Sequence, residues 1–141
     1  MTSDFCIALH ALVYLDHKAC ALSSEQLADN ICTNPARVRK VMAKLAKAGM
    51  IETREGNAGG YVNKANPSKT TLADIADALD ARFVEMSWLS GDTDKDCLVS
   101  SGMSGIMQDI LDDLDSVCRK RLAQTTVADI GRKIFSRRNK T

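Results

Sequence analysis

The sequence lacks an apolar run long enough to cross a membrane, which takes about 20 residues. Its longest uncharged stretches, residues 5–15 and 98–108, are shorter and contain histidine or serine and glycine. The first residues, Met1 to Asp4, lack the basic region of a signal peptide, so we expect a cytoplasmic protein. Two prolines and eight glycines are too few for a disordered or fibrous chain.

Cysteine and histidine are too few and too scattered for a disulfide framework or a structural zinc site. The five cysteines, none of them in a C-x-x-C pair, are Cys6, Cys20, Cys32, Cys97 and Cys118. Only two histidines are available to a zinc hydrolase, and the sequence contains no P-loop, H-E-x-x-H motif or nucleophile–base pair. We therefore expect neither an enzyme nor a metal centre.

Charge is abundant and unevenly distributed, although the formal net charge is only +1. Residues 1–32 sum to −3, residues 33–69 to +6, residues 71–118 to −9 and residues 119–141 to +7. Such blocks indicate one surface that meets a polyanion and another that avoids it. Solvated helix faces without a partner are the alternative interpretation.

Three helices are predicted in the first third of the chain. Apolar residues at helical spacing mark an amphipathic helix over residues 4–16. Ser23 and Gln26 can form a capping box that opens a short second helix. Asn34 as N-cap and Pro35 at the first helical position open the third, and Gly49 can end it.

The third helix has one apolar and one cationic face. At about 100° per residue, one quadrant holds Val38, Val41, Met42 and Leu45. A separate face holds Arg37, Lys40, Lys44 and Lys47, with Arg39 on its flank. Preceded by a short helix and a tight turn, this pattern indicates a helix-turn-helix whose second helix approaches DNA in the major groove. An ordinary helical hairpin with a solvated lysine face is the alternative.

A glycine-rich hairpin follows directly. Strand-like residues 50–54 and 61–64 flank the loop 55–60, in which Gly59 and Gly60 allow backbone amides to approach a phosphate, with Arg54 at the base. A helix-turn-helix followed by a hairpin is the winged form, and this order of elements predicts DNA binding.

The second half is predicted to be helical. Thr71 caps a helix, and residues 125–130 repeat the pattern of residues 70–75. After a loop at 87–96, the longest helix is expected from about Met103 to Leu122. Its apolar seam, which we interpret as a dimerisation surface, consists of Met103, Met107, Ile110, Leu114 and Val117. An intrachain core helix is the alternative.

The predicted fold is mostly α with a small β-hairpin wing: a winged helix-turn-helix domain with a long C-terminal dimerisation helix. We expect the DNA-binding domain at 1–80 and a connecting loop at 81–96. The dimerisation helix and a C-terminal helix and tail that pack back on the first domain are expected at 97–141.

Several motifs together resemble the Rrf2-type winged helix-turn-helix regulators, the family of IscR, NsrR and CymR. They are LSSEQLA (22–28), NPARVRKV (34–41), LAKAGMI (45–51), GGY (59–61) and TLADI (71–75). The resemblance covers essentially the whole chain. It implies a bacterial repressor or activator that binds a roughly palindromic operator as a homodimer.

The sequence departs from the cluster-binding members of this family. Those members carry cysteines repeated about every six residues in and after the loop before the long helix, because an iron–sulfur cluster needs a full ligand set. Here only Cys97 is present, followed at that spacing by Met103 and Asp109, with Asp112 near the position of a family histidine. We therefore expect no iron–sulfur cluster and no other cofactor.

Two sets of site residues follow. The expected DNA contacts are Ser24, Thr33, Asn34, Arg37, Arg39, Lys40, Lys44, Arg54, Asn57, Gly59, Gly60 and Tyr61. Cys97 is the first redox-sensing candidate, with a buried structural cysteine as the alternative, and Cys32 could pair with it within or between subunits. Cys6, Cys20 and Cys118 are expected to be helix-packing or bystander thiols. A protein-interaction module, or a regulator controlled by a small ligand or a partner protein, is the alternative function.

Overall fold

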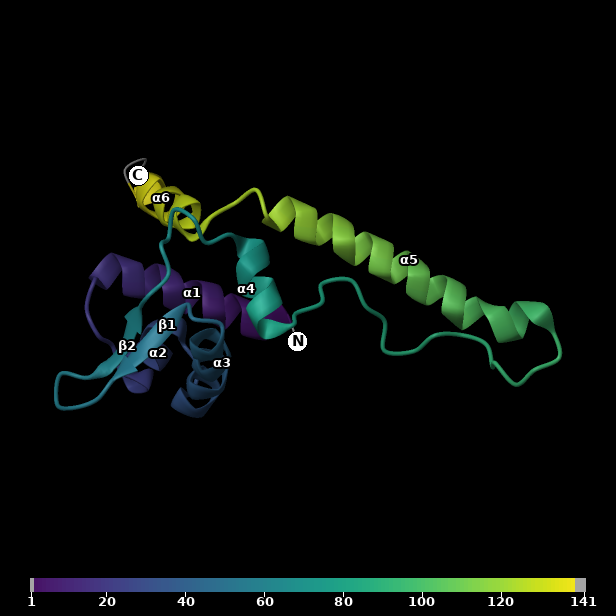
Figure 1. Ribbon diagram of the computed structural model, residues 1–141, viewed down its shortest axis with the longest axis horizontal. Coiled ribbons are helices and arrows are strands. Elements are labelled where there is room, and N and C mark those ends of the chain that lie inside the picture. Colours follow the sequence, from purple (N-terminus) through teal and green to yellow (C-terminus); the bar gives the residue numbers. More distant parts are fainter. Residues whose placement is uncertain (1, 139–141) are drawn as a thin grey trace.

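The computed structural model describes residues 2–138 and consists mainly of helices, with one two-stranded hairpin (Figure 1). The elements are α1 (Thr2–Lys18), α2 (Ser24–Ile31), α3 (Pro35–Lys47), β1 (Ile51–Arg54), β2 (Gly60–Asn63), α4 (Leu72–Leu79), α5 (Leu98–Leu122) and α6 (Val127–Arg138). This architecture confirms the predicted fold class. The part of the predicted C-terminal tail at 139–141 lies outside the described residues.

The helix starts follow from local hydrogen bonds. The Ser23 hydroxyl accepts the Gln26 amide at 3.1 Å while the Gln26 side chain accepts the Ser23 amide at 2.8 Å, which confirms the predicted capping box. Asn34 accepts the Arg37 amide at 2.8 Å and caps α3. Between the two helices, Cys32 takes a left-handed conformation (φ 66°) and turns the chain.

The core surrounds α1, which contacts α2, α3, α4, α6 and β2. The neighbouring helices contribute apolar side chains spaced one helical turn apart, so the stripes meet and exclude water. The largest fully buried side chains are Leu12, Leu15, Leu27, Met42, Leu45, Ile51, Ile75, Val38 and Val41. The apolar quadrant predicted for α3 is therefore confirmed.

The hairpin is fixed to the helices at the start of β2. The two strands are antiparallel with Ile51 opposite Asn63 and Arg54 opposite Gly60. Tyr61 exchanges two backbone hydrogen bonds with Leu22, of 2.8 and 3.0 Å. A Cβ on Gly60 would lie 2.5 Å from the Leu22 carbonyl oxygen, so only glycine permits this approach.

The chain leaves this compact part along an extended segment, returns as the long arm α5, and ends with α6 against α1 (Figure 1). The start of α6 pairs with the start of α4: the Leu72 amide donates to Thr125 and the Val127 amide to Thr70, both at 2.9 Å. The two similar TLADI-like segments thus lie side by side.

The predicted start of the long helix was wrong by five residues, because α5 begins at Leu98 and not near Met103. Serines and glycines at 100–105 interrupt the apolar pattern without preventing a helix. Helix α1 likewise extends two residues beyond each predicted end.

The C-terminal half of α5 is clamped to the end of α4 and to the segment that follows it. The carboxylate of Asp115, 4% exposed, accepts the amides of Phe83 at 2.7 Å and Val84 at 3.1 Å. Arg119 lies 3.4 Å from the same carboxylate and also pairs with Asp77 of α4. Asp115 is therefore a buried acid within an otherwise acidic and largely exposed segment of α5.

This clamp makes stability depend on pH. Burial opposes ionisation, but the amides of Phe83 and Val84 and the Arg119 guanidinium outweigh it and hold the pKa of Asp115 below its usual value. The stabilisation is therefore present above the unfolded-state pKa of about 3.9 and is lost as pH falls through the lower folded-state pKa.

We expect Asp115→Ala to lower the free energy of unfolding at pH 7 by about 1–3 kcal/mol, because two half-buried amides lose their acceptor. Urea unfolding at pH 7 and below pH 4 should show the difference from the unmodified protein shrinking in acid. Asp113→Ala, on an exposed position of α5, is the matched control. A difference that stays constant with pH contradicts the role given to the carboxylate.

Candidate nucleic-acid interface

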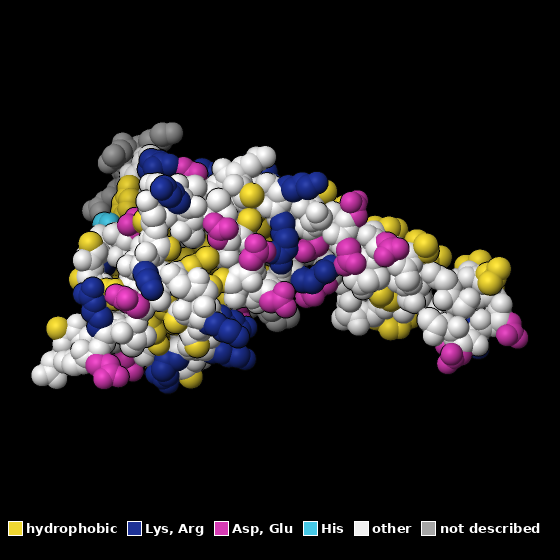
Figure 2. All heavy atoms as spheres, viewed as in Figure 1, with side chains coloured by type: hydrophobic (Ala, Val, Ile, Leu, Met, Phe, Trp, Pro, Cys, Tyr) yellow, Lys and Arg dark blue, Asp and Glu magenta, His cyan; other side chains and the backbone are white. Residues whose placement is uncertain are grey.

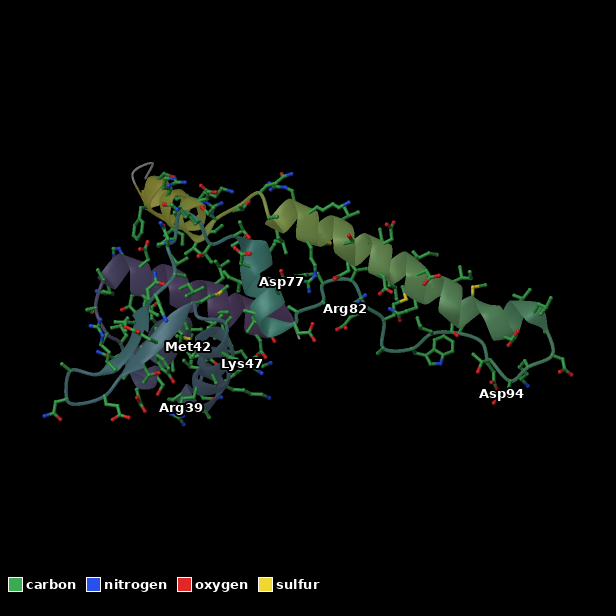
Figure 3. The ribbon with its side chains drawn as sticks, in the orientation of Figure 1. Arg39, Met42, Lys47, Asp77, Arg82 and Asp94 are labelled. Carbon is green, nitrogen blue, oxygen red and sulfur yellow. The ribbon has the colours of Figure 1, made fainter. Side chains whose placement is uncertain are left out.

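Helix α3 presents a cationic face to solvent. Its outward residues Arg37, Arg39, Lys40, Lys44 and Lys47 are all exposed. Figure 2 shows Lys and Arg side chains gathered over this helix, and Figure 3 shows Arg39 and Lys47 projecting from α3 while Met42 points into the fold. An exposed helix of this charge has the electrostatic character that DNA phosphates attract.

The two arginines are held by neighbouring helices, whereas the lysines are not. Arg39 Nη1 donates to the Ser24 hydroxyl at 3.2 Å and lies 3.8 Å from Glu25 on α2. Arg37 Nη2 donates to the Ser3 hydroxyl on α1 at 2.7 Å. Within residues 2–138, the three lysines of α3 make no salt bridge.

These contacts bring several predicted site residues together. The Ser24 hydroxyl accepts a hydrogen bond from Arg39, and the Asn34 side-chain oxygen accepts one from the Arg37 amide. Thr33, in the turn, is half-buried. The partners Ser3 and Glu25 were not predicted as part of the site. Ser3 is 34 residues from Arg37, and nothing in the local pattern of either residue indicates the contact.

The wing offers fewer cationic groups than α3. Its exposed loop carries Asn57 at the tip, and Arg54 lies 3.8 Å from Glu52 on the same strand. Gly59, like Gly60, has no room for a side chain, since its Cβ would meet the Arg54 carbonyl oxygen at 2.3 Å. Tyr61 packs half-buried against the core. Packing within the protein is therefore enough to explain why glycine stands at 59 and 60 and tyrosine at 61, without a role in DNA binding.

The apolar seam of α5 is largely uncovered. Leu114 is 46% and Val117 56% exposed, and Ile110 and Met103 are exposed as well; only Met107 is half-buried. Hydrophobic side chains accordingly run along the arm in Figure 2. Leu111, on the inner side of the helix, is buried.

Cys97 is the N-cap of α5 and is exposed, so a buried structural role is excluded for it. The amides of Ser100 and Val99 hold the pKa of its thiol below the ordinary value. The start of α5 and the end of α2, which carries Cys32, lie at opposite ends of the molecule (Figure 1), so the fold does not bring this pair together within one subunit. Cys6 and Cys20 are both exposed, so of the two roles expected for them the bystander thiol fits and helix packing does not.

Within residues 2–138, no group of three or more His, Cys, Asp or Glu side chains is arranged to hold a metal ion. Asp112, further along α5, is engaged by Arg82 at 2.8 Å and Gln108 at 2.9 Å. No helix in the same range is long and apolar enough to span a bilayer.

Comparison with known proteins agrees with this architecture. The family model Rrf2, described as an iron-dependent transcriptional regulator, matches residues 1–133. YwnA of Bacillus subtilis (strain 168), described as an HTH-type transcriptional regulator, is 24% identical over 137 residues, covering 96% of this chain and 99% of YwnA.

Two solved structures are similar over nearly the whole chain. One, described as a transcriptional regulator from Lactobacillus plantarum, has a TM-score of 0.83 and 26% identity, covering 95% of this chain and 91% of that one. The other, CymR, described as the global cysteine regulator of B. subtilis, has a TM-score of 0.64 and 19% identity, covering 94% and 96%. At that identity the likeness to CymR concerns the fold.

Proposed function

The chain belongs to the Rrf2 family of transcriptional regulators, and we propose that it acts as a homodimer on a roughly palindromic operator. DNA binding through a winged helix is the property of this family that the fold supports directly. The observation that carries the proposal is the exposed cationic face of α3, whose three lysines have no salt-bridge partner within residues 2–138.

The residues of this face divide by role. Arg37 and Arg39 lie in the first half of α3, the part of a recognition helix that reaches base edges, and guanidinium groups pair bidentately with guanine. Lys40 and Lys44 supply point charges suited to phosphates. Arg54 and Asn57 of the wing are proposed to contact the DNA backbone beside the groove that α3 enters.

Homodimerisation is supported by the amount of exposed surface. A compact monomer of 15.3 kDa exposes about 7,100 Å², whereas this chain exposes 9071 Å². Part of this surface is the apolar seam of α5, which the rest of residues 2–138 leaves largely exposed. A two-fold axis through α5 would cover both copies of the seam and set the two α3 helices about one DNA turn apart, near 34 Å.

The proposal is tested by selecting genomic fragments with the purified full-length protein and titrating the bound fragment with salt. Binding through several lysines and arginines should weaken steeply and linearly on logarithmic axes as salt rises. A protein-interaction module would select no fragment, and its mainly apolar contacts would respond weakly to salt. Either of those outcomes contradicts DNA binding.

The iron dependence in the family's description does not fit the donors of this chain. Cys97 is the only thiol at the start of α5, Met103 and Asp109 follow at the family spacing, and Asp112 is already bound to Arg82. One thiolate is too few ligands for an iron–sulfur cluster. We therefore propose regulation without a cluster.

A thiol input at Cys97 is our proposal for redox sensing. The exposed thiolate would attack one oxygen of hydrogen peroxide, break the O–O bond and become a sulfenate, releasing water. We expect peroxide to change operator affinity about fivefold or more in the unmodified protein, and to leave Cys97→Ser unchanged in a binding titration. An equal change in both proteins would assign the effect to another group and contradict a sensing role for Cys97.

A further inference from the structure

A cavity of about 610 Å³ lies between α1 and α6. Small-ligand sites typically measure about 300–1,000 Å³ and are mostly apolar. The walls are formed by Leu9 and Val13 of α1 and by Ile130, Ile134 and Phe135 of α6. Phe135 remains 40% and Ile134 49% exposed, so the chain leaves this apolar surface uncovered.

The polar lining of the cavity includes one lysine, two histidines and an asparagine. Lys18 and His17 lie at one end, where His17 packs on the Phe135 ring with centroids 4.5 Å apart. His10 Nε2 lies 2.7 Å from the Asn30 side-chain oxygen. The lining residues within the described range include no Asp or Glu. A buried or half-buried anion would therefore meet attraction here without a competing carboxylate.

We propose that this cavity is an effector site for a small aromatic carboxylate. Its flat ring would pack between the α1 and α6 side chains beside Phe135, which offers an aromatic face. Its carboxylate would meet Lys18 and His17 at the rim. Apolar walls with a few placed polar groups supply affinity and orientation respectively.

The position of the cavity also gives a route to DNA, and this step rests on the proposed function. The His10–Asn30 contact joins the cavity wall to the end of α2, two residues before the Cys32 turn that leads to α3. The opposite wall, α6, is linked through residues 123–126 to α5. A ligand that wedges α1 and α6 apart would shift α2 or α5, and so the placement of the two recognition helices.

Ligand binding is tested on the full-length protein with 2-naphthoate, by displacement of the fluorescent probe 8-anilino-1-naphthalenesulfonate and by calorimetry. The neutral 2-naphthalenemethanol has the same rings and is expected to bind at least about tenfold more weakly. Lys18→Gln should remove that preference, and Ile134→Glu, at an exposed lining position, should reduce binding of naphthoate. Lys133→Gln, exposed on α6 outside the lining, should change neither.

The site is overturned if naphthoate fails to bind, if the alcohol binds equally well, or if Ile134→Glu binds like the unmodified protein. Regulation is tested by titrating the selected operator fragment with and without saturating naphthoate, with an expected change of about five- to 150-fold that is absent in Ile134→Glu. Naphthoate binding without any DNA binding would contradict the proposed function and leave the site standing. If the protein binds both naphthoate and the operator fragment but naphthoate does not change the operator affinity, regulation through this cavity is overturned.

Discussion

Leu114→Glu is expected to turn the protein into a monomer and to weaken operator binding by about 10²–10⁴-fold, the advantage that linking two binding modules provides. Leu114 belongs to the exposed seam of α5, where a two-fold interface would bury two glutamates face to face without partners. Because Leu114 is 46% exposed in the single chain, the substitution should leave the fold of each protomer intact.

Sedimentation at micromolar concentration measures the assembly, and circular dichroism checks the fold. Ser116→Glu adds the same charge to α5 at an exposed position outside the seam, and it should remain dimeric with unchanged operator affinity. A Leu114→Glu protein that sediments as a dimer would place the interface elsewhere. An unmodified protein that is monomeric at this concentration would remove the basis for the palindromic operator.

The parts of the fold that were predictable depend on residues three or four positions apart. Ser23 with Gln26 and Asn34 with the Arg37 amide are closed within one helical turn, so their sequence spacing alone determines the bond. The same holds for the buried face of α3, because a regular helix converts spacing into direction.

Contacts between distant segments could not be predicted in this way. Asp115 has the spacing of a solvent-facing acid on α5, yet amides 31 and 32 residues earlier bury it. Gly60 was assigned to DNA because glycines admit phosphates, whereas the close neighbour is the Leu22 carbonyl. The cavity between α1 and α6 exists because two ends of the chain meet, which no local pattern encodes.

The candidate site shows both cases. The cationic face of α3 was evident from the sequence because its charges share one helix. The partners of the two arginines were not evident, because they come from other helices. Ser3 and Asp4 of α1 bind Arg37. Ser24 and Glu25 of α2 bind Arg39. In the proposed complex each arginine would exchange these partners for DNA, so part of its binding free energy would be used to release them.

The double substitution Arg37→Ala, Arg39→Ala is expected to abolish sequence preference while leaving weak, general DNA binding. Each guanidinium that reads a base contributes about 1–3 kcal/mol of discrimination, and the lysines of α3 still attract phosphates. Arg39→Ala alone should weaken the specific fragment and hardly affect random DNA. Arg39→Lys, which keeps the charge but loses the planar fork, should resemble Arg39→Ala on the specific fragment.

Lys44→Ala is the matched control, because Lys44 lies on the same helix and is assigned to a phosphate. It should weaken specific and random DNA alike and flatten the slope of log affinity against log salt by about one unit. Lys120→Ala, on α5 away from α3, should leave that slope unchanged. Fluorescence anisotropy at several salt concentrations measures all of these quantities. If the double variant binds the selected fragment as tightly and as selectively as the unmodified protein, the bases are read by residues other than Arg37 and Arg39.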